Sequence, residues 1–396
     1  MIFYVVISTI LTLAPKQEKQ EVSVPYSPPF GILEPIHFTH SINYPSDVSF
    51  LIDNIEGRPI TTETDAIVYT IPTSRTKFGY QQSLAFMAKA VGIDTETQKY
   101  NLQGLKATYQ DELRTLDVDI TTFNFEYELN YSKIPTIFSR RSTPDVDTVK
   151  EEAKSFLRKM NKFSQTLAQG TQNVIFLSYD PPTDTFNVVN TPEEANVVEV
   201  DFFAPNLNSH PVVSPTYFNS HVFVTMVFTE EGPIVIKSHV ASFDPIDPSA
   251  QGTQGTSAQR TGAMGADAIP TSGTYPIKTG DDAWQELITG KGIIVSPSKG
   301  STKIIVREMF IGYYALEEYQ PYIMPVYVFL GDNGFAGYVS AVKDEYVSKI
   351  LKQPISPSSY PLPTPEGEPT TTPSEIVVPT ETQIPQTTEP TPAENI

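Results

Sequence analysis

One segment of the chain, residues 275–342, constrains its own folding more tightly than any other. Thr279 is a suitable helix N-cap, and two acidic residues follow in the first turn, where the helix dipole favours negative charge. Gly290 is placed to end the helix. The apolar residues between them recur on one helical face: Ala283, Trp284, Leu287 and Ile288. The segment therefore predicts an amphipathic helix over 280–289.

Three β-rich runs follow this helix, at 303–314, 322–330 and 335–342. The last two are joined by Gly-Asp-Asn-Gly at 331–334, which is typical of a tight hairpin. The segment thus predicts a helix packed on a small antiparallel sheet, with Trp284 close to Phe329 and Tyr327. Its residues are packing residues, and they form no catalytic constellation.

The same segment resembles a known family. The order YPIKTGDDAWQELITGKG, KIIVREMFIGYY and MPVYVFLGDNGFAGYV resembles the closing segment of YycI-type proteins and, more loosely, PepSY-like modules. The matching residues are Ala283, Trp284, Leu287, Gly290, Gly312, Tyr313, Pro325, Val326, Tyr327, Val328, Phe329 and Tyr338. The resemblance implies a membrane-anchored extracytoplasmic regulator, which in YycI acts on a sensor kinase. It implies no catalytic motif.

The helix-then-strands pattern occurs twice more. In residues 36–140, a helix predicted at 79–91 precedes a hairpin that turns near Thr121. In residues 141–244, a helix opens at Thr143 with Pro144 at its first position, runs to Gly170, and precedes several strands. The expected fold class is therefore α+β, with several small modules, each a helix packed on an antiparallel β-sheet. The third module spans 275–352, and a flexible Gly/Ser/Thr linker at 245–274 precedes it.

The two ends differ from these modules. Residues 1–14 are apolar and are interpreted as a partial membrane anchor or signal segment, with a buried strand as the alternative. Residues 15–35 follow as a Pro-rich stalk. Residues 353–396 are acidic and rich in Pro and Thr, which predicts a disordered spacer, either glycosylated or simply solvated. These features predict a single N-terminal membrane anchor and an extracytoplasmic body.

Charge and composition exclude several classes of protein. The net charge is −19, and six of the acids lie beyond Lys352, which leaves −13 for the rest of the chain. Such a field repels phosphate backbones, so we expect no nucleic-acid partner. The chain has 0 cysteines, which excludes disulfides, thiolate metal sites and cysteine nucleophiles.

Two patterns suggest chemistry, and both are weak. Glu34, His37 and His40 are spaced for metal binding on a helix, but Pro35 and the β-rich surroundings argue against a helix there. Ser296-x-x-Lys299 and Lys-Thr-Gly at 278–280 resemble elements of penicillin-recognising serine enzymes, in reversed order. We therefore predict no catalytic residue, no metal site and no cofactor.

Tyrosine provides the remaining clue. The chain has 20 tyrosines, and Tyr313, Tyr314, Tyr319 and Tyr322 form a possible interaction surface, with half-buried sheet residues as the alternative. The expected function is that of a non-enzymatic regulatory or protein-interaction protein, with a membrane sensor protein as the candidate partner. Two other functions stay open: a cell-surface module that binds wall polymer, and a hydrolase with an unrecognised site.

Overall fold

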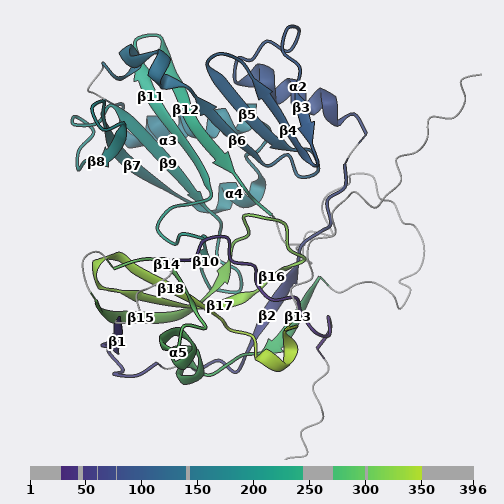
Figure 1. The fold of residues 1–396 in the computed structure, drawn as a ribbon, viewed down its shortest axis with the longest axis vertical. Coiled ribbons are helices and arrows are strands. Elements are labelled where there is room, and N and C mark those ends of the chain that lie inside the picture. The colour runs from purple at the N-terminus through teal and green to yellow at the C-terminus, as the bar shows by residue number, and fades with distance from the viewer. Residues whose placement is uncertain are drawn as a thin grey trace, which may run out of the picture. The chain divides into compact units, whose positions relative to one another are not determined.

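The computed structural model describes residues 28–42, 48–59, 61–76, 78–139, 143–243, 271–298 and 302–349. Three sheets, of nine, six and three strands, hold most of this part of the chain (Figure 1). The nine-stranded sheet is antiparallel throughout, in the order β3-β4-β5-β6-β12-β11-β9-β7-β8. Its strands are β3 (Asn101–Gln103), β4 (Lys106–Gln110), β5 (Arg114–Asp119), β6 (Phe125–Leu129), β7 (Thr171–Asp180), β8 (Thr185–Val188), β9 (Val197–Phe203), β11 (Val222–Thr229) and β12 (Gly232–Val240).

Three helices pack against this sheet: α2 (Tyr80–Ala90), α3 (Val146–Lys159) and α4 (Gln165–Gln169). Each contributes a buried leucine, Leu84, Leu157 and Leu167, to one hydrophobic core that the sheet shares. The apolar residues whose spacing predicted helices in 79–91 and 141–170 therefore contribute to this core.

The six-stranded sheet has the order β1-β15-β17-β18-β14, and β10 also pairs with β15. Strands β1 and β10 run parallel to β15, whereas β17, β18 and β14 are antiparallel to their neighbours. Helix α5 (Gly280–Ile288) packs on β18 through Ala283 and Leu287. The strands are β1 (Ser49–Ile52), β10 (Val212–Val213), β14 (Ile293–Ser296), β15 (Lys303–Tyr314), β17 (Pro325–Gly331) and β18 (Phe335–Ser340).

A small antiparallel sheet joins β13 (Ser272–Pro276), β2 (Asp65–Thr70) and β16 (Tyr322–Ile323). Strand β2 thus pairs with strands that lie more than two hundred positions later in the sequence.

Short 3₁₀ turns lie at Tyr131–Lys133, Pro135–Phe138, Asp332–Gly334 and Asp344–Tyr346.

The predicted α+β fold class is wrong, because the structure is mostly β-sheet and its helices do not each cover a sheet of their own. Strand β6, in the first predicted module, pairs with β12, in the second, and the two modules share one sheet. Strands β1 and β2 also belong to the first module in sequence but pair with β15 and β13. Edge strands with unpaired backbone groups readily pair with other edges, and this merging leaves fewer edges exposed.

Local predictions in the third segment are confirmed. The Thr279 hydroxyl accepts from the backbone N–H of Asp282 at 3.1 Å, and Gly290 adopts a φ of +77° just after the helix. Asn333 and Gly334 both have positive φ, as a tight hairpin requires. The Trp284 ring lies 6.0 Å from that of Phe329 and 6.4 Å from that of Phe50, and it packs against the core cluster that includes Tyr327.

The helix predicted over 143–170 is divided in two. Asp145 is the N-cap of α3, so Pro144 precedes the helix and is not at its first position. The chain turns at Asn161, whose φ is +56°, before α4 begins. Gly170 does follow α4, but its φ is ordinary. A Cβ there would lie 1.8 Å from the Phe203 carbonyl oxygen, so close packing on β9 requires the glycine.

The predicted anchor at 1–14 and the acidic tail at 353–396 lie outside the described residues, as do residues 15–27 of the stalk and 245–270 of the linker. The described end of the stalk packs onto the body: Leu33 is fully buried and bridges to Val347. The end of the linker is likewise ordered, because β13 begins at Ser272.

Within the described ranges, no helix is both long enough and apolar enough to cross a membrane.

Candidate functional site

The four tyrosines of the predicted interaction surface occupy two different environments. Tyr313 and Tyr314 are buried, with 0% and 1% of their surface exposed, so they belong to the core and not to a surface. Tyr313 packs 5.4 Å from Tyr69, and Tyr314 packs 4.9 Å from Phe38. Neighbouring residues of a strand point to opposite faces, and both faces of β15 are covered at this end.

Tyr319 and Tyr322 lie toward solvent. Tyr319 is 41% exposed and packs 6.1 Å from Phe243, while Tyr322 is half-buried and packs 5.3 Å from Phe30. Burial and the neighbouring Glu34 raise the pKa of Tyr322, and for Tyr319 burial, Tyr322 and Glu34 raise it. We call Phe30, Phe243, Tyr319 and Tyr322 the aromatic strip.

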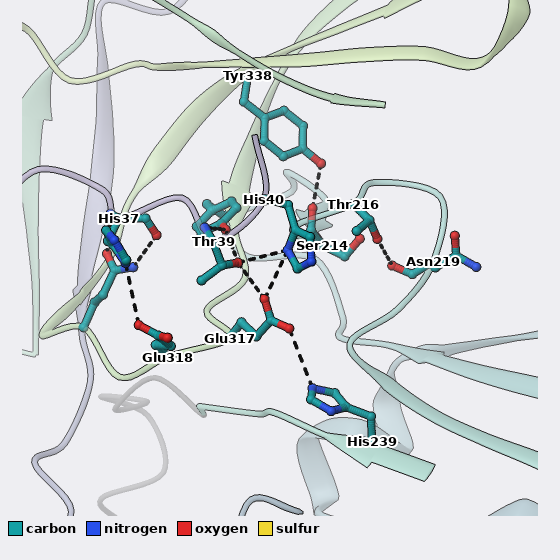
Figure 2. Close-up of polar contacts among 12 residues, drawn as sticks. His37, Thr39, His40, Ser214, Thr216, Asn219, His239, Glu317, Glu318 and Tyr338 are labelled. Carbon is teal, nitrogen blue, oxygen red and sulfur yellow. Dashed lines mark hydrogen bonds and ion pairs between the residues drawn. The ribbon is translucent and has the colours of Figure 1, made fainter. Parts of the chain in front are cut away.

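A histidine–glutamate cluster lies next to the strip in sequence, around Glu317 (Figure 2). The Thr39 hydroxyl donates to Glu317 Oε2 at 2.6 Å, and His40 Nδ1 lies 3.2 Å from the same oxygen. His239 Nε2, on β12, lies 3.9 Å from Glu317 Oε1. The cluster thus joins the N-terminal segment, the loop after β15 and the nine-stranded sheet.

The electrostatics of this cluster are set by burial. Burial lowers the pKa of His239 more than Glu126 and Glu317 raise it, so its imidazole is predominantly neutral at pH 7. Glu317 is only 25% exposed, and its carboxylate gains most from the short Thr39 hydrogen bond. The carboxylate is therefore held as an acceptor inside the protein, in a role that links segments.

The spacing of Glu34, His37 and His40 does not bring the two histidines to a common partner. His37 Nδ1 lies 3.7 Å from Glu318, whereas His40 faces Glu317. In the ranges that the structure covers, no group of three or more His, Cys, Asp or Glu is placed to hold a metal ion. The sequence singled out His37 and His40, of which only His40 belongs to the cluster. It did not indicate their glutamate partners, which lie far away in the chain.

The serine-enzyme elements take structural roles where they are described. The Ser296 hydroxyl donates to the Gly334 carbonyl at 2.7 Å. The Lys278 ammonium is buried and pairs with Glu286 and Asp344, each at 2.8 Å. Neither of these described contacts is the nucleophile–base contact that acyl transfer requires. Lys299 lies outside the described residues.

Two carboxylates, Glu199 and Asp201, lie on β9. Asp201 is fully buried, and burial together with the charge of Glu199 raises its pKa to about 7. Its Oδ1 accepts from the Ser220 backbone N–H at 3.1 Å. Burial also raises the pKa of Glu199. An acid that no solvent reaches is poorly placed to contact a substrate, so the pair does not form a catalytic site in this arrangement.

Comparisons with known proteins add little. No protein-family model matches the chain, and no curated protein matches it. Among solved structures, it is similar to an uncharacterized protein from Eubacterium rectale at 13% identity, over 75% of this chain and 89% of that chain, with a TM-score of 0.32. A likeness of this strength carries no argument about function. Membership of the YycI-type or PepSY-like families therefore stays a prediction.

Proposed function

We propose that this chain is a non-enzymatic protein-interaction protein with a regulatory role, anchored to the membrane through residues 1–14 with its body outside the cytoplasm. The aromatic strip would be its partner-binding surface. The observation that carries the proposal is the exposure of Tyr319 beside Tyr322 and Phe30. Aromatic side chains provide large contact area at low entropic cost, and interfaces are enriched in them.

The surroundings of the strip indicate the chemistry of the partner. Glu34 lies near both Tyr319 and Tyr322, and the Glu318 side chain is 69% exposed. Ile32, two residues from Phe30, is 67% exposed. An apolar surface with acidic residues at its edge suits a protein that presents aliphatic or aromatic side chains flanked by lysine or arginine. A membrane sensor protein with such an extracytoplasmic surface is the partner we propose.

Site-specific crosslinking in cells tests this proposal. A photoreactive amino acid at Tyr319 of the full-length native chain is expected to capture a membrane protein, and the adduct is expected to fractionate with membranes. The matched control places the same group at Phe86, a 55% exposed aromatic position on α2 outside the strip. Tyr322→Ala should weaken capture at 319 without lowering the thermal midpoint by more than a few degrees, because Tyr322 is only half-buried.

The outcomes separate the proposal from its alternatives. Equal capture of the same protein at positions 319 and 86 would contradict a role for the strip. An adduct that a wall-degrading enzyme removes, and a protease does not, would favour the wall-polymer module. Recovery of the full-length native chain entirely in the cytosol would contradict the anchor.

A further inference from the structure

One edge of strand β15 is paired only near its two ends. Residues 303–306 pair with β1, and residues 313–314 pair with β10, and both of these partners run parallel to β15. Among the strands that the structure describes, none pairs with this edge over residues 307–312. The sheet therefore has a gap one strand wide and about 20 Å long between the end of β1 and the start of β10.

The hydrogen bonds at the end of β15 show which backbone groups face this gap. The Tyr313 N–H points to the β10 side, because it donates to the Pro211 carbonyl at 2.8 Å. The Tyr314 N–H points the opposite way and donates to the Met324 carbonyl at 3.2 Å, on the β17 side. Successive residues of β15 thus direct their backbone groups alternately to the gap and to β17.

This alternation leaves two residues with their backbone groups in the gap. The register between β15 and β17 is regular from Glu308 to Tyr313, so the direction seen at Tyr313 repeats every second residue. The N–H and C=O of Met309 and Ile311 therefore face the gap, whereas those of Phe310 face β17. An extended segment in the gap has about four backbone hydrogen bonds to gain from these two residues.

A groove of about 590 Å³ gives access to this edge. Residues 307–311 of β15 line it, together with the loop after β1 and His210, which lies just before β10. The residues from the loop are Asn54, Ile55, Glu56, Thr61, Thr62 and Glu63. Ligand sites in proteins have volumes of about 300–1,000 Å³, so the groove is large enough for a short peptide segment.

The groove carries negative charge. Glu56, Glu63 and Glu308 all line it, and Glu56 and Glu308 are exposed. The guanidinium of Arg307, which also lines the groove, forms ion pairs with two aspartates, at positions 53 and 332, so its charge is offset within the protein. A ligand with positive charge is therefore favoured.

We propose that this gap is a docking site for an extended, lysine- or arginine-bearing segment of a partner protein, which adds a strand to β15. Backbone hydrogen bonds to Met309 and Ile311 hold the segment, and its basic side chains lie beside Glu63 and Glu308. None of the four residues of the aromatic strip lines the groove, so this second surface does not depend on the strip.

Two other occupants fit this site less well. The tail beyond Lys352 carries six acidic residues and no lysine or arginine, so the glutamates of the groove repel it. A second copy of the chain would have to offer one of its own edge strands. The edge strands β3, β8 and β14 contain no lysine or arginine, so they lack the charge that the groove favours.

Titration calorimetry of the full chain with a synthetic peptide tests the site. The probe acetyl-Thr-Lys-Val-Lys-Val-Thr-amide is expected to bind at low salt with a Kd on the order of 100 μM. The same peptide with glutamate in place of both lysines should bind at least about tenfold more weakly. Glu308→Lys should weaken the lysine peptide at least about fivefold, since it places a cation in the groove.

Two matched controls accompany this titration. Glu193→Lys makes the same charge change at an exposed glutamate that does not line the groove, and it should alter the Kd less than about twofold. Tyr322→Ala, which changes the aromatic strip, should leave peptide binding unaltered. Failure of the strip and failure of this site are therefore distinguishable.

Amide hydrogen exchange measures the strand pairing directly and needs no variant. Saturating lysine peptide should slow exchange at Met309 and Ile311 by about tenfold or more, whereas Phe310, whose N–H faces β17, is protected in both states and is the internal control. Absence of saturable binding up to about 2 mM, equal binding of the glutamate peptide, or binding without new protection at Met309 and Ile311 would overturn the proposal. Protection that rises with protein concentration in the absence of peptide would also overturn it, because a second copy would then occupy the gap.

Discussion

Replacing Glu317 tests whether the histidine–glutamate cluster holds the N-terminal segment against the rest of the protein. Glu317→Ala removes the acceptor of the 2.6 Å Thr39 hydrogen bond and the carboxylate that His40 and His239 share. Because His239 is mostly neutral at pH 7, the Thr39 bond accounts for most of the loss at that pH.

The expected magnitude follows from the partners. A hydrogen bond to a charged group contributes about 1.5–3 kcal/mol, and the partial exposure of Glu317 places this one near the lower end. We expect Glu317→Ala to lower the free energy of unfolding by about 2 kcal/mol and Glu317→Gln, which keeps an acceptor, by about 1 kcal/mol. Glu318→Ala is the matched control, because its side chain is 69% exposed and should cost less than about 0.5 kcal/mol.

Urea unfolding followed by circular dichroism measures these differences. A double-mutant cycle with Thr39→Ala should give a coupling energy of about 1–2 kcal/mol. In addition, Glu317→Gln should lower the pKa of His239 further, since the charge of Glu317 raises it, and proton NMR of the imidazole reads this directly. The reasoning fails if Glu317→Ala costs no more than Glu318→Ala, or if the coupling energy is zero.

Three further predictions follow from the core. The pKa of Asp201 is raised from 3.8 to about 7, so the folded state keeps a proton that the unfolded state loses, and stability should fall as pH rises from about 4 to 7. Asp201→Asn should remove this loss of stability at high pH and raise the free energy of unfolding at pH 8 by up to about 4 kcal/mol. An Asp201→Asn variant whose stability, measured by urea unfolding, depends on pH as the parent's does would contradict this prediction. Gly170→Ala places a Cβ against the Phe203 carbonyl and should cost about 1–3 kcal/mol in thermal unfolding, whereas a neutral effect would show that β9 can move. Trp284→Ala should lower the free energy of unfolding by about 2–3 kcal/mol, which is less than for a fully buried tryptophan, because Trp284 is only partly buried between Phe50 and Phe329. A variant as stable as the parent would show that these contacts contribute little.

The candidate site was only partly predictable from the sequence. The partners of His37 and His40 were not predictable from the sequence, because each histidine faces a different glutamate that lies far away in the chain. The tyrosine pattern likewise combined core and surface residues. As neighbours on a strand, Tyr313 and Tyr314 point to opposite faces, and the sequence pattern is that of half-buried sheet residues. Both are buried because other parts of the protein cover both faces of β15. A small cavity that His221 lines gave no signal in the sequence, because its walls come from distant segments.

The sequence by itself determined those features that a few adjacent residues control. The capping box at Thr279 and the hairpin at Asn333 and Gly334 depend on local hydrogen bonds and on backbone conformations that short motifs specify. Only the tertiary structure decided how the strands combine into sheets. The pairing of Phe125 with Val240, and of Ser49 with Lys303, is made by backbone groups that every residue carries. Such pairings leave no residue pattern, so local periodicity predicted separate modules where strand edges in fact merge into shared sheets.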